Sequence, residues 1–129
     1  MSKLTYSENR MALREDKPLA WLTNEVKTPP FSREARIYAG GLLRRLQKGE
    51  KIVMPDSRPM PSIGPGCHEL RIEDVEMNKI WRIIYKITKD AIVIGDVLDK
   101  KTTKTPLNTI NICKRRFRLY ELAAGDDNE

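Results

Sequence analysis

Two neighbouring segments of the chain, residues 67–72 and 80–86, alternate between apolar and polar side chains. This period of two is the pattern of a β-strand with one buried face. The short polar stretch between them, residues 73–79, suits a hairpin connection, so we expect the two strands to pair antiparallel. A slip of one residue would turn one apolar set towards water, which fixes the parity of the register. The residues that must share the buried face are Leu70, Ile72, Trp81 and Ile83.

The same parity brings two like charges together. Arg71 and Arg82 must lie on the other face of the hairpin, opposite or diagonal to each other, and Glu69 shares that face. Like charges in this arrangement cost roughly 0.2–1 kcal/mol, so removing either arginine should relieve repulsion. Two explanations are open: Glu69 neutralises the pair, or the face binds an anion. His68 falls on the buried side and is better explained as a packed histidine.

Apolar patterns elsewhere fill in the rest of the fold. Residues 19–22 suit a short strand, and residues 91–98 are apolar on both faces, which is typical of a central strand covered on each side. Helical spacing predicts one helix over 32–49 and another that begins at 105. The proline-rich stretch 54–66 is typical of a stiff loop. We therefore expect a small single α+β domain, with an antiparallel (mixed) sheet of about four strands packed by helices.

Each predicted helix carries signals for its ends and its inner face. Ser32 suits the N-cap of the first helix and Gly49 its C-cap. The two glycines at 40–41 cost that helix about 1 kcal/mol each, and we attribute them to close packing on the sheet. Thr105 is expected to cap the final helix, with Pro106 at its first position. The expected inner face of the final helix comprises Leu107, Ile110, Cys113, Phe117 and Tyr120.

Composition limits the class of protein. Residues 1–16 are expected to form a polar arm, 17–122 the folded domain, and 123–129 an acidic disordered tail. The net charge of +6 indicates an acidic partner, such as nucleic acid, an anionic membrane surface or an acidic protein. No apolar run is long enough to span a membrane and the start lacks a signal core, so we expect a cytoplasmic protein. One histidine and two cysteines predict no metal, no cofactor and no disulfide framework.

Several stretches together resemble a known family. They are Trp21–Ser32, Ser57–Gly64, the predicted hairpin, Lys100–Thr102 and Thr105–Pro106. From Lys17 to Tyr120 the chain resembles the RelE/ParE superfamily of small bacterial toxins, and specifically its phage-derived HigB-like branch. The resemblance implies a compact RelE-like fold and a type II toxin-antitoxin toxin that inhibits translation by cutting mRNA in the ribosome. It also implies a helix-turn-helix antitoxin as partner.

Such a toxin would be a metal-independent endoribonuclease. The ribose 2′-hydroxyl attacks the adjacent phosphorus, so the enzyme must orient the backbone, move protons and stabilise extra negative charge. The planar guanidinium group of arginine can bind two phosphate oxygens at once, so it is suited to stabilising this negative charge. The resemblance assigns Arg82 to the phosphate, and parity adds Arg71. Lys100 and Lys101 lie where related toxins place a basic catalytic or phosphate-binding residue. Glu69 is either the general base or a structural partner of the arginines.

The sequence departs from the catalytic patterns of the superfamily at one point. No histidine or histidine–tyrosine pair lies near the C-terminus, where several ribonuclease members carry one. The proton donor and acceptor are therefore unassigned. Two other functions remain open. One is a catalytically silent member of the same fold that binds RNA or a protein, and the other is a ParE-type inhibitor of DNA gyrase.

Two further surfaces follow from the helical spacing. Basic residues expected to contact RNA are Arg33, Arg44 and Lys48 on the first helix and Lys104 before the last. Residues expected to contact the antitoxin are Ile112, Arg115 and Leu119, on the side of the last helix away from its inner face. The alternative is that the arm of residues 1–16 covers this second surface.

Overall fold

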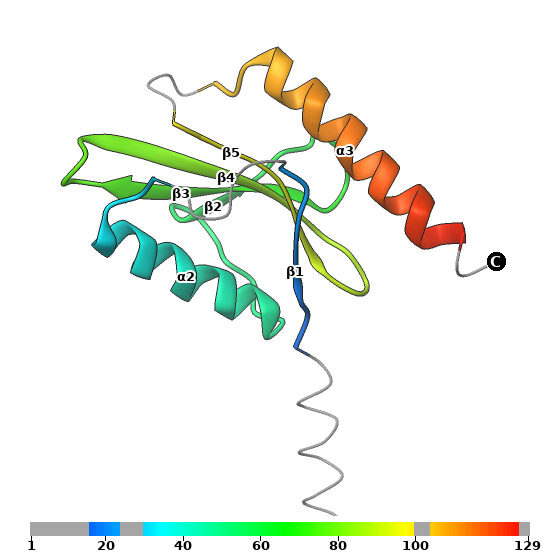
Figure 1. Ribbon diagram of the computed structural model, residues 1–129, viewed down its shortest axis with the longest axis horizontal. Coiled ribbons are helices and arrows are strands. Elements are labelled where there is room, and N and C mark those ends of the chain that lie inside the picture. Colours follow the sequence, from blue (N-terminus) through cyan, green and yellow to red (C-terminus); the bar gives the residue numbers. More distant parts are fainter. Residues whose placement is uncertain (1–15, 24–29, 100–103, 127–129) are drawn as a thin grey trace, which may run out of the picture.

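In the part of the chain that the structure describes, five strands form one mixed sheet, with a helix on each side of it (Figure 1). The computed structural model describes residues 16–23, 30–99 and 104–126. In chain order the elements are β1 (Leu19–Trp21), α2 (Arg33–Gln47), β2 (Ser57–Pro59), β3 (Cys67–Asp74), β4 (Lys79–Ile87), β5 (Ile92–Asp99) and α3 (Leu107–Asp126). The strand order is β1-β5-β4-β3-β2, with β1 parallel to β5 and the other neighbours antiparallel. The α+β class is confirmed, with five strands instead of about four.

The hairpin of β3 and β4 has the predicted parity. Leu70 pairs with Ile83 and Ile72 with Trp81, while Arg71 lies directly opposite Arg82. The apolar face of this hairpin packs under α2. The cluster between α2 and the sheet includes Ala35, Leu42, Leu46, Leu70, Ile72, Trp81, Ile83, Tyr85, Ile92 and Ile94.

The opposite face of the sheet packs against α3 (Figure 1). Cys113 and Phe117 of α3 are buried there beside Ile84 and Val93, and Ile110 and Tyr120 pack against the same cluster. In β5, Ile92 and Ile94 face α2 whereas Val93 faces α3. The prediction of a strand covered on both sides is therefore confirmed.

A bulge in β5 lets α3 approach the sheet closely. Ile84 pairs with Asp96 but Tyr85 pairs with Ile94, which leaves Gly95 at the step in the register. A Cβ atom on Gly95 would lie 2.7 Å from Cζ of Phe117, so only glycine fits beneath that ring. Arg116 Nη1 donates a hydrogen bond to the carbonyl oxygen of Gly95 at 2.6 Å, which fixes α3 over the bulge.

The ends of α2 follow the sequence signals. The Ser32 side chain caps the helix by accepting from Ala35 N. At the other end Gly49 adopts a φ of 93°, and the N–H groups of Gly49 and Glu50 donate to carbonyls of the last turn. This left-handed termination is the role that glycine plays in a Schellman motif.

Some expectations about the helices and the loop are wrong. A Cβ added to Gly40 or Gly41 would meet nothing within 4 Å, so these glycines do not serve close packing on the sheet. Leu107 is 70% exposed and does not belong to the inner face of α3, where Thr109 is buried instead. The predicted loop 54–66 contains the short strand β2, and α3 continues to Asp126, into the segment expected to be a tail.

Candidate functional site

A buried carboxylate holds two arginines from neighbouring strands on the α3 side of the sheet. Arg58 on β2 is paired with Glu69 on β3, and Arg82 on β4 is paired with Arg71, two residues along β3 from Glu69. Glu69 Oε1 accepts from Arg58 Nε at 2.8 Å and from Arg82 Nη1 at 3.1 Å. The side chains alternate along each strand, so all three project from the same face. We call Arg58, Glu69 and Arg82 the arginine cluster.

The second oxygen of Glu69 ties the arginine cluster to the last helix. Thr105 Oγ1 donates to Glu69 Oε2 at 2.9 Å. Thr105 was expected to cap α3, but the helix begins at Leu107 and its first backbone hydrogen bond runs from Ile110 N to the Pro106 carbonyl, so Pro106 occupies the N-cap position. Glu69 is only 1% exposed, and both of its oxygens accept hydrogen bonds from the protein.

The two arginines predicted from parity differ in their surroundings. Arg82 is 6% exposed and ion-paired to Glu69. Arg71 lies directly opposite Arg82 on β3 and is exposed to solvent. Glu69 therefore neutralises part of the charge on this face, while Arg71 is exposed to solvent.

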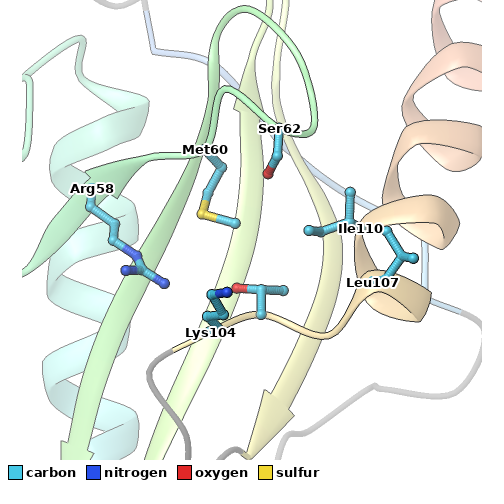
Figure 2. Close-up of a pocket in the computed structure, with 7 residues that line it drawn as sticks. Arg58, Met60, Ser62, Lys104, Leu107 and Ile110 are labelled. Carbon is cyan, nitrogen blue, oxygen red and sulfur yellow. The ribbon is translucent and has the colours of Figure 1, made fainter.

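Arg58 lines two cavities. One, of about 260 Å³, is lined by Met54, Pro55, Arg58, Glu69, Arg71 and Arg82. The other, of about 450 Å³, is lined by Arg58, Met60, Ser62, Lys104, Thr105, Leu107 and Ile110. Figure 2 shows the second cavity, with Arg58 and Lys104 directed into it from one side and Leu107 and Ile110 bordering it on the other. Together the linings contain four basic side chains and one carboxylate, so the site carries a positive charge suited to an anion.

The structure separates the basic residues expected to contact RNA. Lys104 is exposed at the second cavity, on the same side as the arginine cluster. Arg33 and Arg44 are exposed on α2 and Lys48 is exposed at its C-cap, and α2 covers the opposite face of the sheet. Arg44 also pairs with Asp16 at 2.9 Å. The predicted residues Lys100 and Lys101 lie outside the described residues.

The residues expected to contact an antitoxin lie on the outer side of α3. Arg115 and Leu119 are exposed, Leu119 to 59%, while Ile112 is half-buried. Leu122, one turn beyond Leu119, is 54% exposed and continues the same stripe. The other candidate to cover this stripe is the predicted arm of residues 1–16, of which residues 1–15 lie outside the described residues.

The remaining reactive side chains have structural surroundings. The His68 ring stacks on the Tyr85 ring at a centroid distance of 5.3 Å, on the α2 side of the sheet, as parity predicted. Burial raises the pKa of the Cys67 thiol, and burial followed by the nearby Asp96 raises the pKa of Cys113 to about 12. Neither thiol is therefore ionised at neutral pH, as a nucleophile or metal ligand would have to be.

Two members of the site were not expected from the sequence. Arg58 belongs to the motif 57–64 that carries the family resemblance, but its strand is three residues long and shows no alternation. Thr105 was given only a capping role. The only available signal for Arg58 was its place in this motif. Its neighbours Ser57 and Pro59 show neither helical spacing nor apolar alternation, so no local pattern explains the arginine.

The described part of the chain shows neither a metal site nor a membrane span. Within residues 16–23, 30–99 and 104–126, no group of three or more His, Cys, Asp or Glu side chains is placed to hold a metal ion. None of the helices described is long and apolar enough to cross a membrane.

Comparison with known proteins identifies the family. A search among curated proteins gave no match. Residues 30–118, which span α2, β2 to β5 and most of α3, match the family model of "Phage derived protein Gp49-like (DUF891)". The chain therefore belongs to the Gp49-like family of phage-derived proteins, a toxin-like family within the RelE/ParE-like superfamily.

Proposed function

We propose that this chain is a HigB-like toxin of a type II toxin-antitoxin system that cleaves mRNA on the ribosome in the cytoplasm. The observation that carries the proposal is the arginine cluster between two cavities. A buried carboxylate holds two guanidinium groups in place, and the two cavities that Arg58 lines offer room for parts of a nucleotide chain. Positively charged groups fixed in advance can stabilise the charge that develops on phosphorus during cleavage.

Within this proposal the residues have distinct roles. Arg82 and Arg58 bind the phosphate, and Arg71 contributes charge from the solvent side. Glu69 is a positioning residue, because both of its oxygens already accept hydrogen bonds from Arg58, Arg82 and Thr105. We therefore assign proton transfer, within this proposal, to other groups. Lys100 and Lys101, which follow β5 in the sequence, remain our candidates for proton transfer.

The two layers of the molecule suggest separate partners. Lys104 lies beside the arginine cluster, so it is placed to contact the mRNA strand that is cleaved. Arg33, Arg44 and Lys48 lie beyond the sheet on α2, which suits contact with ribosomal RNA. The outer stripe of α3, formed by Ile112, Arg115, Leu119 and Leu122, suits a helix-turn-helix antitoxin.

The decisive test is expression of the chain without its partner, followed by mapping of mRNA 5′ ends. Growth should stop within a generation, and new 5′ ends should appear within translated messages. A matched variant, Arg82→Lys, keeps the charge beside Glu69 but loses the two-pronged phosphate contact, so it should give few new ends.

Other outcomes would point to the alternative functions. Normal growth at good soluble expression would contradict the proposal and favour a silent binding member of the fold. Growth arrest with intact mRNA and relaxed plasmid supercoiling would favour a ParE-type inhibitor of gyrase.

A further inference from the structure

The larger cavity at Arg58 has two chemically different sides. Met60, Leu107 and Ile110 supply apolar surface, whereas Arg58 and Lys104 supply positive charge (Figure 2). Ser62 and Thr105 add hydroxyl groups at the border. Its volume of about 450 Å³ lies in the range, roughly 300–1,000 Å³, of sites that bind small organic groups. A free phosphate would use the cationic side and leave the apolar side without a contact.

Arg58 connects this cavity to the arginine cluster. Its guanidinium is held by Glu69 and lines both cavities. A ligand whose phosphate lies on Arg58 and Arg82 can therefore extend an attached ring into the space beside Met60 and Ile110. A nucleotide of single-stranded RNA joins a phosphate to a flat, largely apolar base in this way.

We propose that the cavity between the Met60–Ile63 turn and the start of α3 is a nucleobase subsite. It holds the base next to the phosphate bound by the arginine cluster, with the base against Met60, Leu107 and Ile110 and the Ser62 hydroxyl within reach of the base edge. The identity of the ligand as RNA rests on the proposed function. The subsite would make cleavage depend on the base at one position.

The position of the subsite is coupled to the phosphate site by one residue. Thr105 lines the cavity and donates its hydroxyl to Glu69, the carboxylate that holds both arginines. The start of α3, and with it Leu107 and Ile110, is thus fixed relative to the arginine cluster. The distance between bound base and bound phosphate is then set by the fold.

A binding experiment with non-cleavable RNA tests the subsite. The probe is a short fluorescent 2′-O-methyl RNA, compared with probes in which one base at a time is replaced by an abasic ribose. We expect one abasic position to weaken binding to the purified protein roughly tenfold, the size of a typical base contact. Ser62→Phe should fill the cavity and remove this difference while phosphate-dependent binding remains.

A matched pair on α3 controls for changes in the helix. Leu107 and Leu119 are 70% and 59% exposed, so neither replacement by serine should disturb the core. Leu107→Ser should reduce the difference between intact and abasic probes, and Leu119→Ser should leave it unchanged. Melting curves of all variants verify that they are folded.

Three results would overturn the subsite: equal binding of intact and abasic probes at every position, a base preference that survives both Ser62→Phe and Leu107→Ser, or no binding of RNA by the wild-type protein. These readouts do not require catalysis, because the probe lacks a free 2′-hydroxyl. Failure of the subsite is therefore distinguished from failure of the endonuclease function, which the mapping of mRNA ends tests.

Discussion

At the scale of single residues, the buried ion pair between Arg82 and Glu69 changes what the sequence suggests about the two arginines. Treated as neighbouring like charges, Arg71 and Arg82 should each relieve repulsion when removed. Arg82, however, is almost fully buried against a buried carboxylate, and Arg71 is exposed. Removing one member of a buried pair leaves an insufficiently compensated charge, which costs far more than the repulsion.

The first prediction compares Arg82→Ala with Arg71→Ala. Glu69 would keep Arg58 and Thr105, so we expect Arg82→Ala to cost about 3 kcal/mol and lower the Tm by roughly 10 °C. Arg71→Ala should leave the Tm within about 2 °C. Both should reduce cleavage of translated mRNA, and thermal melts together with end mapping check the two effects. Equal melting temperatures for the two variants would show that Arg82 is not a structural partner of Glu69.

The second prediction concerns Asp74, a buried carboxylate on the α2 side. Burial alone would raise its pKa, but hydrogen bonds from Ser32, Met77 and the Trp81 indole outweigh it and lower the pKa of Asp74 to about 2. An unfolded aspartate titrates near 3.9. Because the folded pKa is the lower one, Asp74 stabilises the fold above about pH 4, and this contribution is lost as the pH falls towards 2.

The measurement is the Tm of wild type and Asp74→Asn across pH. Wild type should melt higher at pH 6, and the difference should shrink between about pH 4 and pH 2. Taking the difference cancels the titration of the other carboxylates. A gap that stays constant over this range would contradict the assignment.

At the scale of elements, α2 contains two glycines at positions where the fold does not require glycine. Gly40 and Gly41 lie in the middle of the helix with open space around them, whereas Gly95 in β5 lies against Phe117. Glycine is therefore required at one of these places and unfavourable at the other two.

The third prediction is that alanine has opposite effects at these positions. Gly40→Ala and Gly41→Ala should each stabilise the protein by up to about 1 kcal/mol, since a helix interior favours alanine. Gly95→Ala should destabilise it by roughly 1–3 kcal/mol, because its methyl group would overlap the Phe117 ring. Denaturant titrations measure both. Destabilisation by Gly41→Ala would mean that this face of α2 packs against a further part of the protein.

The fourth prediction belongs to α3. If its outer stripe binds the antitoxin, Leu119→Asp should weaken antitoxin binding at least about tenfold and leave the isolated toxin folded. Ile37→Asp on α2, where the side chain is similarly exposed, is the matched control and should bind normally. Calorimetry with the co-expressed helix-turn-helix partner makes the comparison. Unchanged affinity for Leu119→Asp would place the antitoxin on another face.

The elements also show where sequence reasoning succeeds. Alternation in 67–72 and 80–86 fixes the hairpin register, because half-burial leaves a period of two that a slip would destroy. The strand β2 leaves no such trace, since three residues ending in Pro59 cannot show a period. The contact from Thr105 to Glu69 depends on where α3 comes to lie, which no local pattern specifies. The arginine side of the site could thus be predicted in part, and its cavities could not.

At the scale of the whole molecule, the sheet divides the basic residues between two faces, and this leads to the fifth prediction. Neutralising Arg33, Arg44 and Lys48 should reduce the salt dependence of ribosome binding but leave binding of a short single-stranded RNA unchanged. Lys104→Gln should instead reduce the salt slope for the short RNA, by about 0.7 for a lost contact to a single strand. Filter binding at several salt concentrations measures both. Equal effects of the α2 substitutions on both ligands would mean that RNA reaches around the sheet.

The two edge strands of the sheet affect whether free chains can aggregate. Both β1 and β2 are three residues long, and β2 ends in a proline, which has no N–H group to offer another strand. Short edge strands of this kind are poor templates for strand addition between molecules. If the chain is the toxin proposed above, it must also remain dispersed when no antitoxin is bound to it. Because both edge strands are short, we expect the free chain to resist aggregation through strand addition.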